Sequence, residues 1–158
     1  MSVAPVSAVT HARAFYAALR NALAEPTLAH QLRAAADGAV LGAWTQLTTL
    51  CATQACGALG WVAAAKGRAA APLPVGRQEY LGIDVLAFRH GDDWRRPVAA
   101  IELENGASFQ AVAYATWKVS VVSTELGVVL CYRREPAEIV RLVSRLAAEV
   151  LRAADPTG

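Results

Sequence analysis

Residues 97–104 of the chain read PVAAIELE, and this stretch decides the fold that the sequence predicts. It is apolar except for Glu102 and Glu104, which alternate with Ile101 and Leu103 as the two faces of a β-strand require. Two carboxylates on one face of so apolar a strand are costly to bury without compensation. We therefore expect a central strand that carries a functional site.

A second predicted strand lies just upstream, within residues 79–89. Its apolar residues flank Asp84, and a Gly-Asp-Asp turn signal at 91–93 separates the two strands. Paired as a hairpin, the strands bring Asp84 close to Glu102. Glu79 falls on the opposite face by plain alternation, so it would need a β-bulge to join them.

The rest of the chain reads as helices and two further strands. We predict helices over 9–24, 27–36, 39–55, 108–123 and from 136 onward, a loop over 67–76, and strands over 60–66 and 126–132, the latter buried. Thr27 is expected to cap its helix. The last helix carries one apolar stripe, formed by Ile139, Leu142, Val143, Leu146 and Val150.

This order predicts a single α/β domain over residues 1–158, with a mixed sheet flanked by helices. Its parts are a mainly helical N-terminal segment (1–66), a strand–strand–helix–strand core (77–133) and a C-terminal helix (136–153).

Composition bounds the class of protein. With 55% hydrophobic and 18% charged residues, the chain is not disordered. Its longest apolar stretch, 55–65, contains two glycines and is shorter than the roughly 20 residues that span a bilayer. Three cysteines without a close-spaced pair indicate reduced thiols and a cytoplasmic protein. A net charge of +2 permits a nucleic-acid partner without requiring one, and a homodimer is compatible with the sequence.

The three carboxylates of the predicted hairpin indicate a metal site. Placed together, Asp84, Glu102 and Glu104 raise each other's pKa values, and a bound divalent cation relieves that repulsion. Oxygen ligands favour Mg²⁺ or Mn²⁺. The helix that follows carries one charge between residues 107 and 123, on a stripe expected to face the acidic strand and formed by Gln110, Tyr114 and Lys118.

These residues resemble the PD-(D/E)XK nuclease superfamily over about residues 79–132. Families of this type place an aspartate on one strand and an acidic-x-lysine motif on the next, followed by a helix and a strand. Gly82-Ile83-Asp84 resembles the aspartate motif, and Glu102-Leu103-Glu104 resembles the second motif with Glu104 in place of lysine. Residues 110–114 (QAVAY) are similar to the Gln-x-x-x-Tyr helix motif of RecB-type exonucleases.

The resemblance implies a restriction-endonuclease-like fold and metal-dependent hydrolysis of nucleic acid, with DNA as the expected substrate. It implies that Asp84 and Glu102 hold Mg²⁺ or Mn²⁺, with Glu104 as a further ligand or water-orienting group. Some members are similar in taking the lysine from the following helix, which gives this role to Lys118. Gln110 and Tyr114 would then contact the substrate.

Two other classes of function stay open. A non-catalytic member of the same fold would bind DNA or a partner protein, as a defence or accessory module. A metal-dependent hydrolase would act on a small phosphorylated or other substrate. Arg95 and Arg96, in the predicted hairpin turn, are expected to be solvated rather than bound to phosphate. Whether the lysine of the helix reaches the acidic cluster discriminates an active enzyme from a binding module.

Overall fold

The computed structural model describes residues 8–70, 72–73, 79–91, 93–133 and 135–153. The start of the predicted N-terminal segment, residues 71 and 74–76 of the predicted loop 67–76, and the turn residue Asp92 lie outside them. Within the described residues no helix is both long and apolar enough to cross a membrane.

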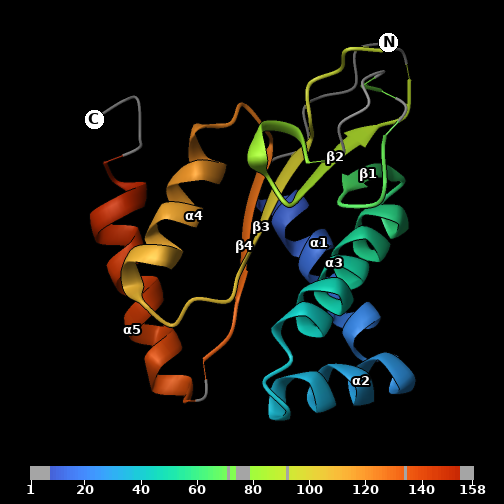
Figure 1. Ribbon diagram of the computed structural model, residues 1–158. Helices are drawn as coiled ribbons and strands as arrows, with labels where there is room; N and C mark the ends of the chain where they lie inside the picture. Colours follow the sequence, from blue (N-terminus) through green and yellow to red (C-terminus); the bar gives the residue numbers. More distant parts are fainter. Residues whose placement is uncertain (1–7, 71, 74–78, 92, 134, 154–158) are drawn as a thin grey trace.

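The fold is a mixed α/β sandwich, which confirms the predicted class. A central sheet lies between three N-terminal helices on one face and two C-terminal helices on the other (Figure 1). The N-terminal helices are α1 (Ala8–Leu23), α2 (Pro26–Asp37) and α3 (Leu41–Ala58). The opposite face is covered by α4 (Phe109–Val121), with α5 (Pro136–Leu146) against α4 on the outside.

The four strands pair in chain order, β1-β2-β3-β4. Their bounds are β1 (Trp61–Ala65), β2 (Val85–Arg89), β3 (Ala99–Glu104) and β4 (Leu126–Cys131). The predicted hairpin is confirmed, because β2 pairs antiparallel with β3 as well as with β1. β4 lies parallel to β3, and α4 makes the crossover that a parallel pair requires. β3 is therefore central, as predicted.

The two faces of β3 enter two different cores. Ile101 and Leu103 pack with Phe15 and Cys51 beneath the N-terminal helices. Ala100 packs in a second cluster that includes Val119 of α4. Because strand side chains alternate, Glu102 shares the face of Ala100 and lies beneath α4. The sheet thus directs one buried acid toward the crossover helix.

The predicted strand at 79–89 begins later than expected. A 3₁₀ turn, η1 (Tyr80–Gly82), occupies its first part, with positive φ at Leu81 (59°) and Gly82 (66°). Such backbone is foreign to a strand, so β2 starts only at Val85 and Asp84 lies on the bend before it. This turn sets the position of the predicted aspartate motif.

The predicted cap of α2 is also different. The helix begins at Pro26, and the Glu25 carboxylate accepts hydrogen bonds from the backbone N–H groups of Thr27 (3.1 Å) and Leu28 (2.7 Å). These bonds, led by that of Leu28, lower the pKa of Glu25. Glu25 therefore takes the capping position assigned to Thr27, because proline at the first helical position moves the start of the helix.

The predicted burial of β4 is wrong, and the apolar stripe of α5 is only partly covered. β4 is an edge strand and is half-buried over most of its length. On α5, Leu142 is buried, but Ile139 is 47% and Val143 59% exposed. The reason lies in the layering, since α5 and its continuation η2 (Ala147–Leu151) lie against α4 rather than on the sheet (Figure 1). One narrow helix–helix contact cannot cover the whole apolar stripe.

Candidate functional site

Asp84 closes the end of the β2–β3 pairing. Its Oδ2 accepts a hydrogen bond from the backbone N–H of Leu103 at 2.8 Å. Val85 is paired with Ile101, so the register places Asp84 level with Glu102. The carboxylate thus satisfies a strand N–H at a point where the neighbouring chain has bent away. Asp84 is half-buried and stays in contact with a hollow described below.

Glu102 is a buried carboxyl with an ammonium partner. The residue is 7% exposed, and its Oε1 lies 2.9 Å from Nζ of Lys118. Burial raises the pKa of Glu102, and the negative charge of Asp84 raises it further, while the Lys118 ammonium and the Asp84 backbone N–H lower it. The net direction is upward, because removal of the carboxylate from water outweighs the ion pair.

Lys118 reaches this cluster from helix α4. Besides the Glu102 contact, its Nζ donates a hydrogen bond to the backbone carbonyl of Gly82 at 2.7 Å. The helix begins after Ser108, whose Oγ accepts from the N–H of Ala111 at 3.2 Å. Its buried residues face the sheet, and Lys118 lies at the edge of that face; the buried residues are Val112, Ala115, Thr116 and Val119.

The rest of the predicted helical stripe stays at the surface. Gln110 is exposed, and Tyr114 is 61% exposed. The Tyr114 ring stacks on Trp117 with centroids 6.0 Å apart, and Nζ of Lys118 lies 5.8 Å from its centre. Tyr114 therefore borders the lysine on its solvent side. Only Lys118 of the stripe contacts the acidic strand.

Glu104 is bound at the β3–α4 turn and not at the Asp84–Glu102 pair. Its Oε1 accepts a hydrogen bond from the backbone N–H of Gly106, where the chain turns from β3 toward α4. A Cβ on Gly106 would come within 2.8 Å of that oxygen, so the turn fits closely around the carboxylate. Within the described ranges, no three side chains of His, Cys, Asp or Glu are grouped as metal ligands would be. The structure thus does not assemble the predicted cluster of three carboxylates.

A polar hollow of about 260 Å³ lies next to Asp84, against helix α3. It is lined by Thr45, Gln46, Thr49, Lys66, Gly67, Glu79 and Asp84. Lys66 and the α3 residues were not predicted as site residues. The strand register could have identified Lys66. Ala65 pairs with Val85, so the next residue, Lys66, lies level with Asp84. The η1 turn allows Glu79 to line the same hollow, as a bulge would have done.

Asp84 and Glu102 are the two predicted carboxylate ligands that lie level with each other, just before β2 and on β3. Oε1 of Glu102 is buried, and its partner is the Lys118 ammonium at 2.9 Å. Asp84 is close enough to raise the pKa of Glu102. Mg²⁺ is commonly held by one or two carboxylates with water and substrate oxygens completing its shell. Asp84 and Glu102 are the residues that would hold it.

Comparison with known proteins yields no match. Neither the models of protein families nor the curated proteins match the chain. No solved structure matches it either. The chemistry of Asp84, Glu102 and Lys118 therefore has to carry any functional assignment.

Proposed function

We propose that the chain is a metal-dependent nuclease of the PD-(D/E)XK type, acting on nucleic acid and most suited to DNA. The observation that carries the proposal is the 2.9 Å contact between Nζ of Lys118 and Oε1 of Glu102, beside Asp84. This contact supports the idea that Lys118, on the helix after the acidic strand, takes the role of the motif lysine. Glu104 occupies the sequence position of that lysine. A cytoplasmic location belongs to the same proposal, and three free thiols support it.

The proposed roles follow from charge and position. Asp84 and Glu102 would hold Mg²⁺ or Mn²⁺, which when bound acidifies a water and polarises the phosphodiester. Lys118 would orient the attacking water and neutralise charge that develops on the phosphate oxygens. Tyr114, exposed beside Lys118, would contact the substrate strand, and Gln110 one turn earlier would extend that contact. Glu104 would hold the β3–α4 turn rather than the cation.

The alternative is a non-catalytic module of the same type that binds nucleic acid or a protein. The observation that favours it is the position of Glu104, whose carboxylate lies where the motif lysine is expected and is bound to Gly106 N–H. In that case the Lys118–Glu102 pair is a structural ion pair that compensates a buried acid.

A cleavage screen on single- and double-stranded DNA and RNA with Mg²⁺ and Mn²⁺ tests the proposal. We expect the wild type to cleave at least one substrate and Lys118→Met to be slowed roughly 100-fold, because one group that stabilises developing charge is lost. Methionine keeps most of the packing of the lysine stem. Arg141→Met, an exposed cation on α5, is the matched control and should cleave at the wild-type rate.

Two outcomes decide against parts of the proposal. Cleavage by Lys118→Met at the wild-type rate would remove the role of the helix lysine. If the wild type cleaves none of the substrates with either metal, the non-catalytic alternative replaces the nuclease.

A further inference from the structure

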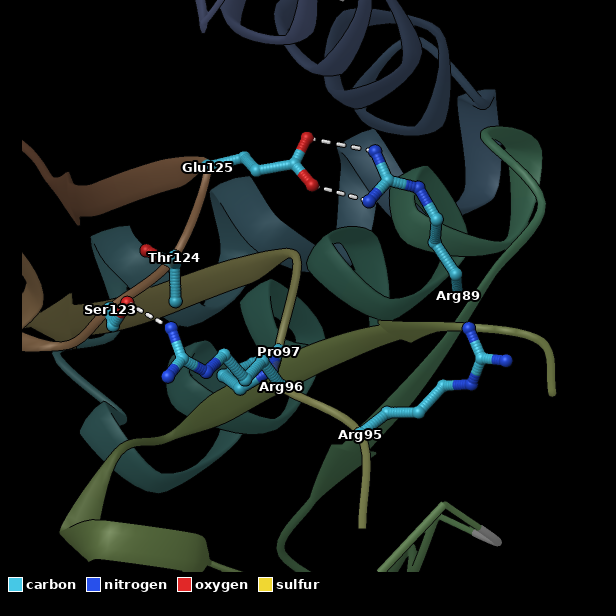
Figure 2. A pocket seen from close by; sticks show the side chains of 7 residues that line it. All are labelled: Arg89, Arg95, Arg96, Pro97, Ser123, Thr124 and Glu125. Atoms are coloured by element: carbon cyan, nitrogen blue, oxygen red, sulfur yellow. Dashed lines mark hydrogen bonds and ion pairs between the residues drawn. The ribbon is translucent and has the colours of Figure 1, made fainter. Parts of the chain in front are cut away.

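A second polar pocket lies at the opposite end of the sheet from Asp84. It forms where β2 ends, β3 begins and the α4–β4 loop passes, and its volume is about 390 Å³ (Figure 2). Its lining residues are Arg89, Arg95, Arg96, Pro97, Ser123, Thr124 and Glu125. Five strand steps separate Asp84 from Arg89, a span of about 17 Å. The pocket is therefore distinct from the carboxylate site.

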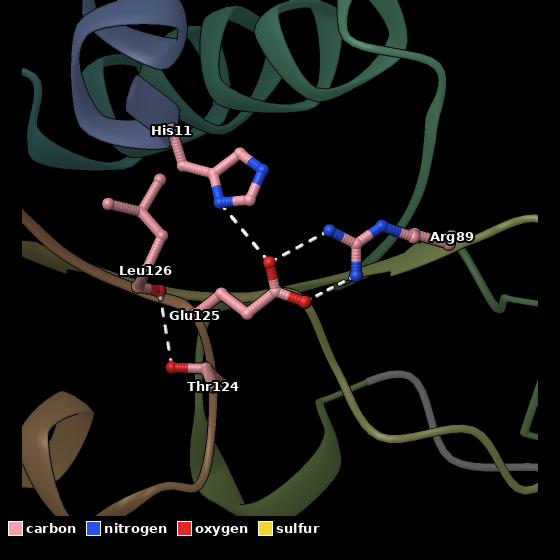
Figure 3. A network of polar contacts seen from close by, with 5 residues as sticks. All are labelled: His11, Arg89, Thr124, Glu125 and Leu126. Carbon is pink, nitrogen blue, oxygen red and sulfur yellow. Dashed lines mark hydrogen bonds and ion pairs between the residues drawn. The ribbon is translucent and has the colours of Figure 1, made fainter. Parts of the chain in front are cut away.

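Among the described residues, the lining holds three arginines and one carboxylate, so it is cationic. That carboxylate, Glu125, forms a two-pronged ion pair with Arg89, in which Nη2 and Oε2 are 2.8 Å apart. The pair raises the pKa of Arg89 and lowers that of Glu125. On its other side Oε2 lies 3.2 Å from Nδ1 of His11, which fixes Glu125 against α1 (Figure 3). Glu125 is thus fully engaged in holding Arg89.

Arg96 adds a positive charge that Glu125 does not balance, and Arg95 contributes a further guanidinium to the lining. Figure 2 shows Arg96 beside Ser123 and Arg95 on the opposite side of the same hollow. Nη1 of Arg96 donates to Oγ of Ser123 at 3.4 Å, so Arg96 has a neutral partner there and Ser123 keeps its own O–H for a further acceptor. Three separate chain segments thus contribute guanidinium and hydroxyl groups to the lining of one concave space.

We propose that this pocket binds a phosphate group, carried by a nucleotide or by a nucleic-acid backbone. Planar guanidinium groups match pairs of phosphate oxygens, and a dianion is best held by more than one cation. The volume lies in the range of about 300–1,000 Å³ found for small-ligand sites. Arg95 and Arg96 supply the charge, Ser123 supplies a hydroxyl donor, and Arg89 with Glu125 forms a rigid wall. Arg95 and Arg96 are both exposed, which agrees with the expectation that they are solvated, and phosphate binding is the role that the proposal adds.

Titration calorimetry with inorganic phosphate, thymidine 5′-monophosphate and a twelve-residue oligothymidylate tests the proposal on the full chain without added metal. We expect the double variant Arg95→Gln/Arg96→Gln to weaken binding at least tenfold. Arg33→Gln, which removes an exposed arginine from α2, is the matched control and should bind like wild type. Equal binding by the double variant and the control would overturn the proposal.

Glu125→Gln provides a second test, in which phosphate binding should become tighter instead of weaker. It removes the one carboxylate among the described lining residues, so phosphate should bind at least threefold more tightly, whereas simple loss of structure would weaken binding. Unchanged or weaker binding by a folded Glu125→Gln protein would count against the pocket. Binding of inorganic phosphate and thymidine 5′-monophosphate would indicate a site for a terminal phosphate. Binding of the oligonucleotide alone would indicate a site for the nucleic-acid backbone, and its salt dependence should then be smaller in the arginine variants.

This inference does not rest on the nuclease proposal. Glu102→Gln, at the far end of the sheet, should leave phosphate binding unchanged and abolish any cleavage. A protein that binds phosphate but cleaves nothing would contradict the nuclease proposal alone. A protein that cleaves nucleic acid but binds no phosphate at this pocket would contradict the present inference alone.

Discussion

The protonation of Glu102 links the candidate site to stability. A carboxyl whose folded pKa lies above its ordinary value binds more protons in the native state than in the unfolded chain. Its favourable contribution is complete below the ordinary value of 4.5 and is lost as the pH rises through the folded pKa. The same protonation would compete with a bound cation, so the proposed metal site weakens toward acid pH.

Glu102→Gln should remove this pH dependence. Glutamine does not titrate, so the free energy of unfolding of the variant relative to wild type should rise between about pH 4 and about pH 7. Urea denaturation across this range measures it, with Glu135→Gln as a control that removes the same charge from an exposed position. A relative stability that falls over this range would mean that the folded pKa of Glu102 is lowered instead.

At the scale of elements, the η1 turn places Asp84 and the Gly82 carbonyl that binds Lys118. Gly82→Ala should destabilise the protein by about 1–2 kcal/mol, because φ is +66° there and alanine is strained in that conformation. A Cβ at Gly82 would meet no described atom within 4 Å, so the effect reports backbone strain and not a clash.

Gly57→Ala is the matched control for the turn. It lies in α3 with equally open surroundings, and alanine favours helix over glycine by about 0.5–1 kcal/mol, so it should stabilise. Thermal unfolding compares the two variants, and equal shifts of the same sign would show that the turn conformation is not specified by Gly82.

The exposed stripe of α5 gives a second prediction for an element. Leu142→Ala should cost about 2–4 kcal/mol, because this residue is the buried contact of the helix. Val143→Ala, one position on and 59% exposed, should change stability by less than about 0.5 kcal/mol. Denaturant midpoints measure both. A comparable loss for Val143→Ala would mean that the stripe is covered in solution.

Periodicity and turn signals predict most of the elements, but not how deeply each is covered. The pattern of β3 predicts a central strand, and the Gly-Asp-Asp turn predicts its hairpin with β2, because both depend on neighbours in the sequence. Alternation also placed Glu102 correctly, and the isolated charge of Lys118 indicated its contact. The position of the Glu104 carboxylate depends on its hydrogen bond with the Gly106 N–H, and the exposure of α5 depends on how the helices are layered. No local sequence pattern encodes either.

At the scale of the molecule, bound metal should stabilise the fold if Asp84 and Glu102 share a cation. Mg²⁺ at about one hundred times its Kd would raise the free energy of unfolding by about 2.7 kcal/mol. Asp84→Asn keeps an acceptor for Leu103 N–H but removes a charge, so its shift with Mg²⁺ should be much smaller. Thermal unfolding with Mg²⁺ or chelator measures both, and equal shifts would place the cation elsewhere.

Chain-order strand pairing has a consequence for synthesis on the ribosome. Each new strand meets a partner that has already emerged, so the sheet grows by short-range steps that favour rapid folding. The nascent chain exposes the open flank of β3 until the crossover helix and β4 have left the exit tunnel. His11, near the start of the described chain, can contact Glu125 only after the α4–β4 loop has emerged, so this contact forms late in translation, before the contacts of α5.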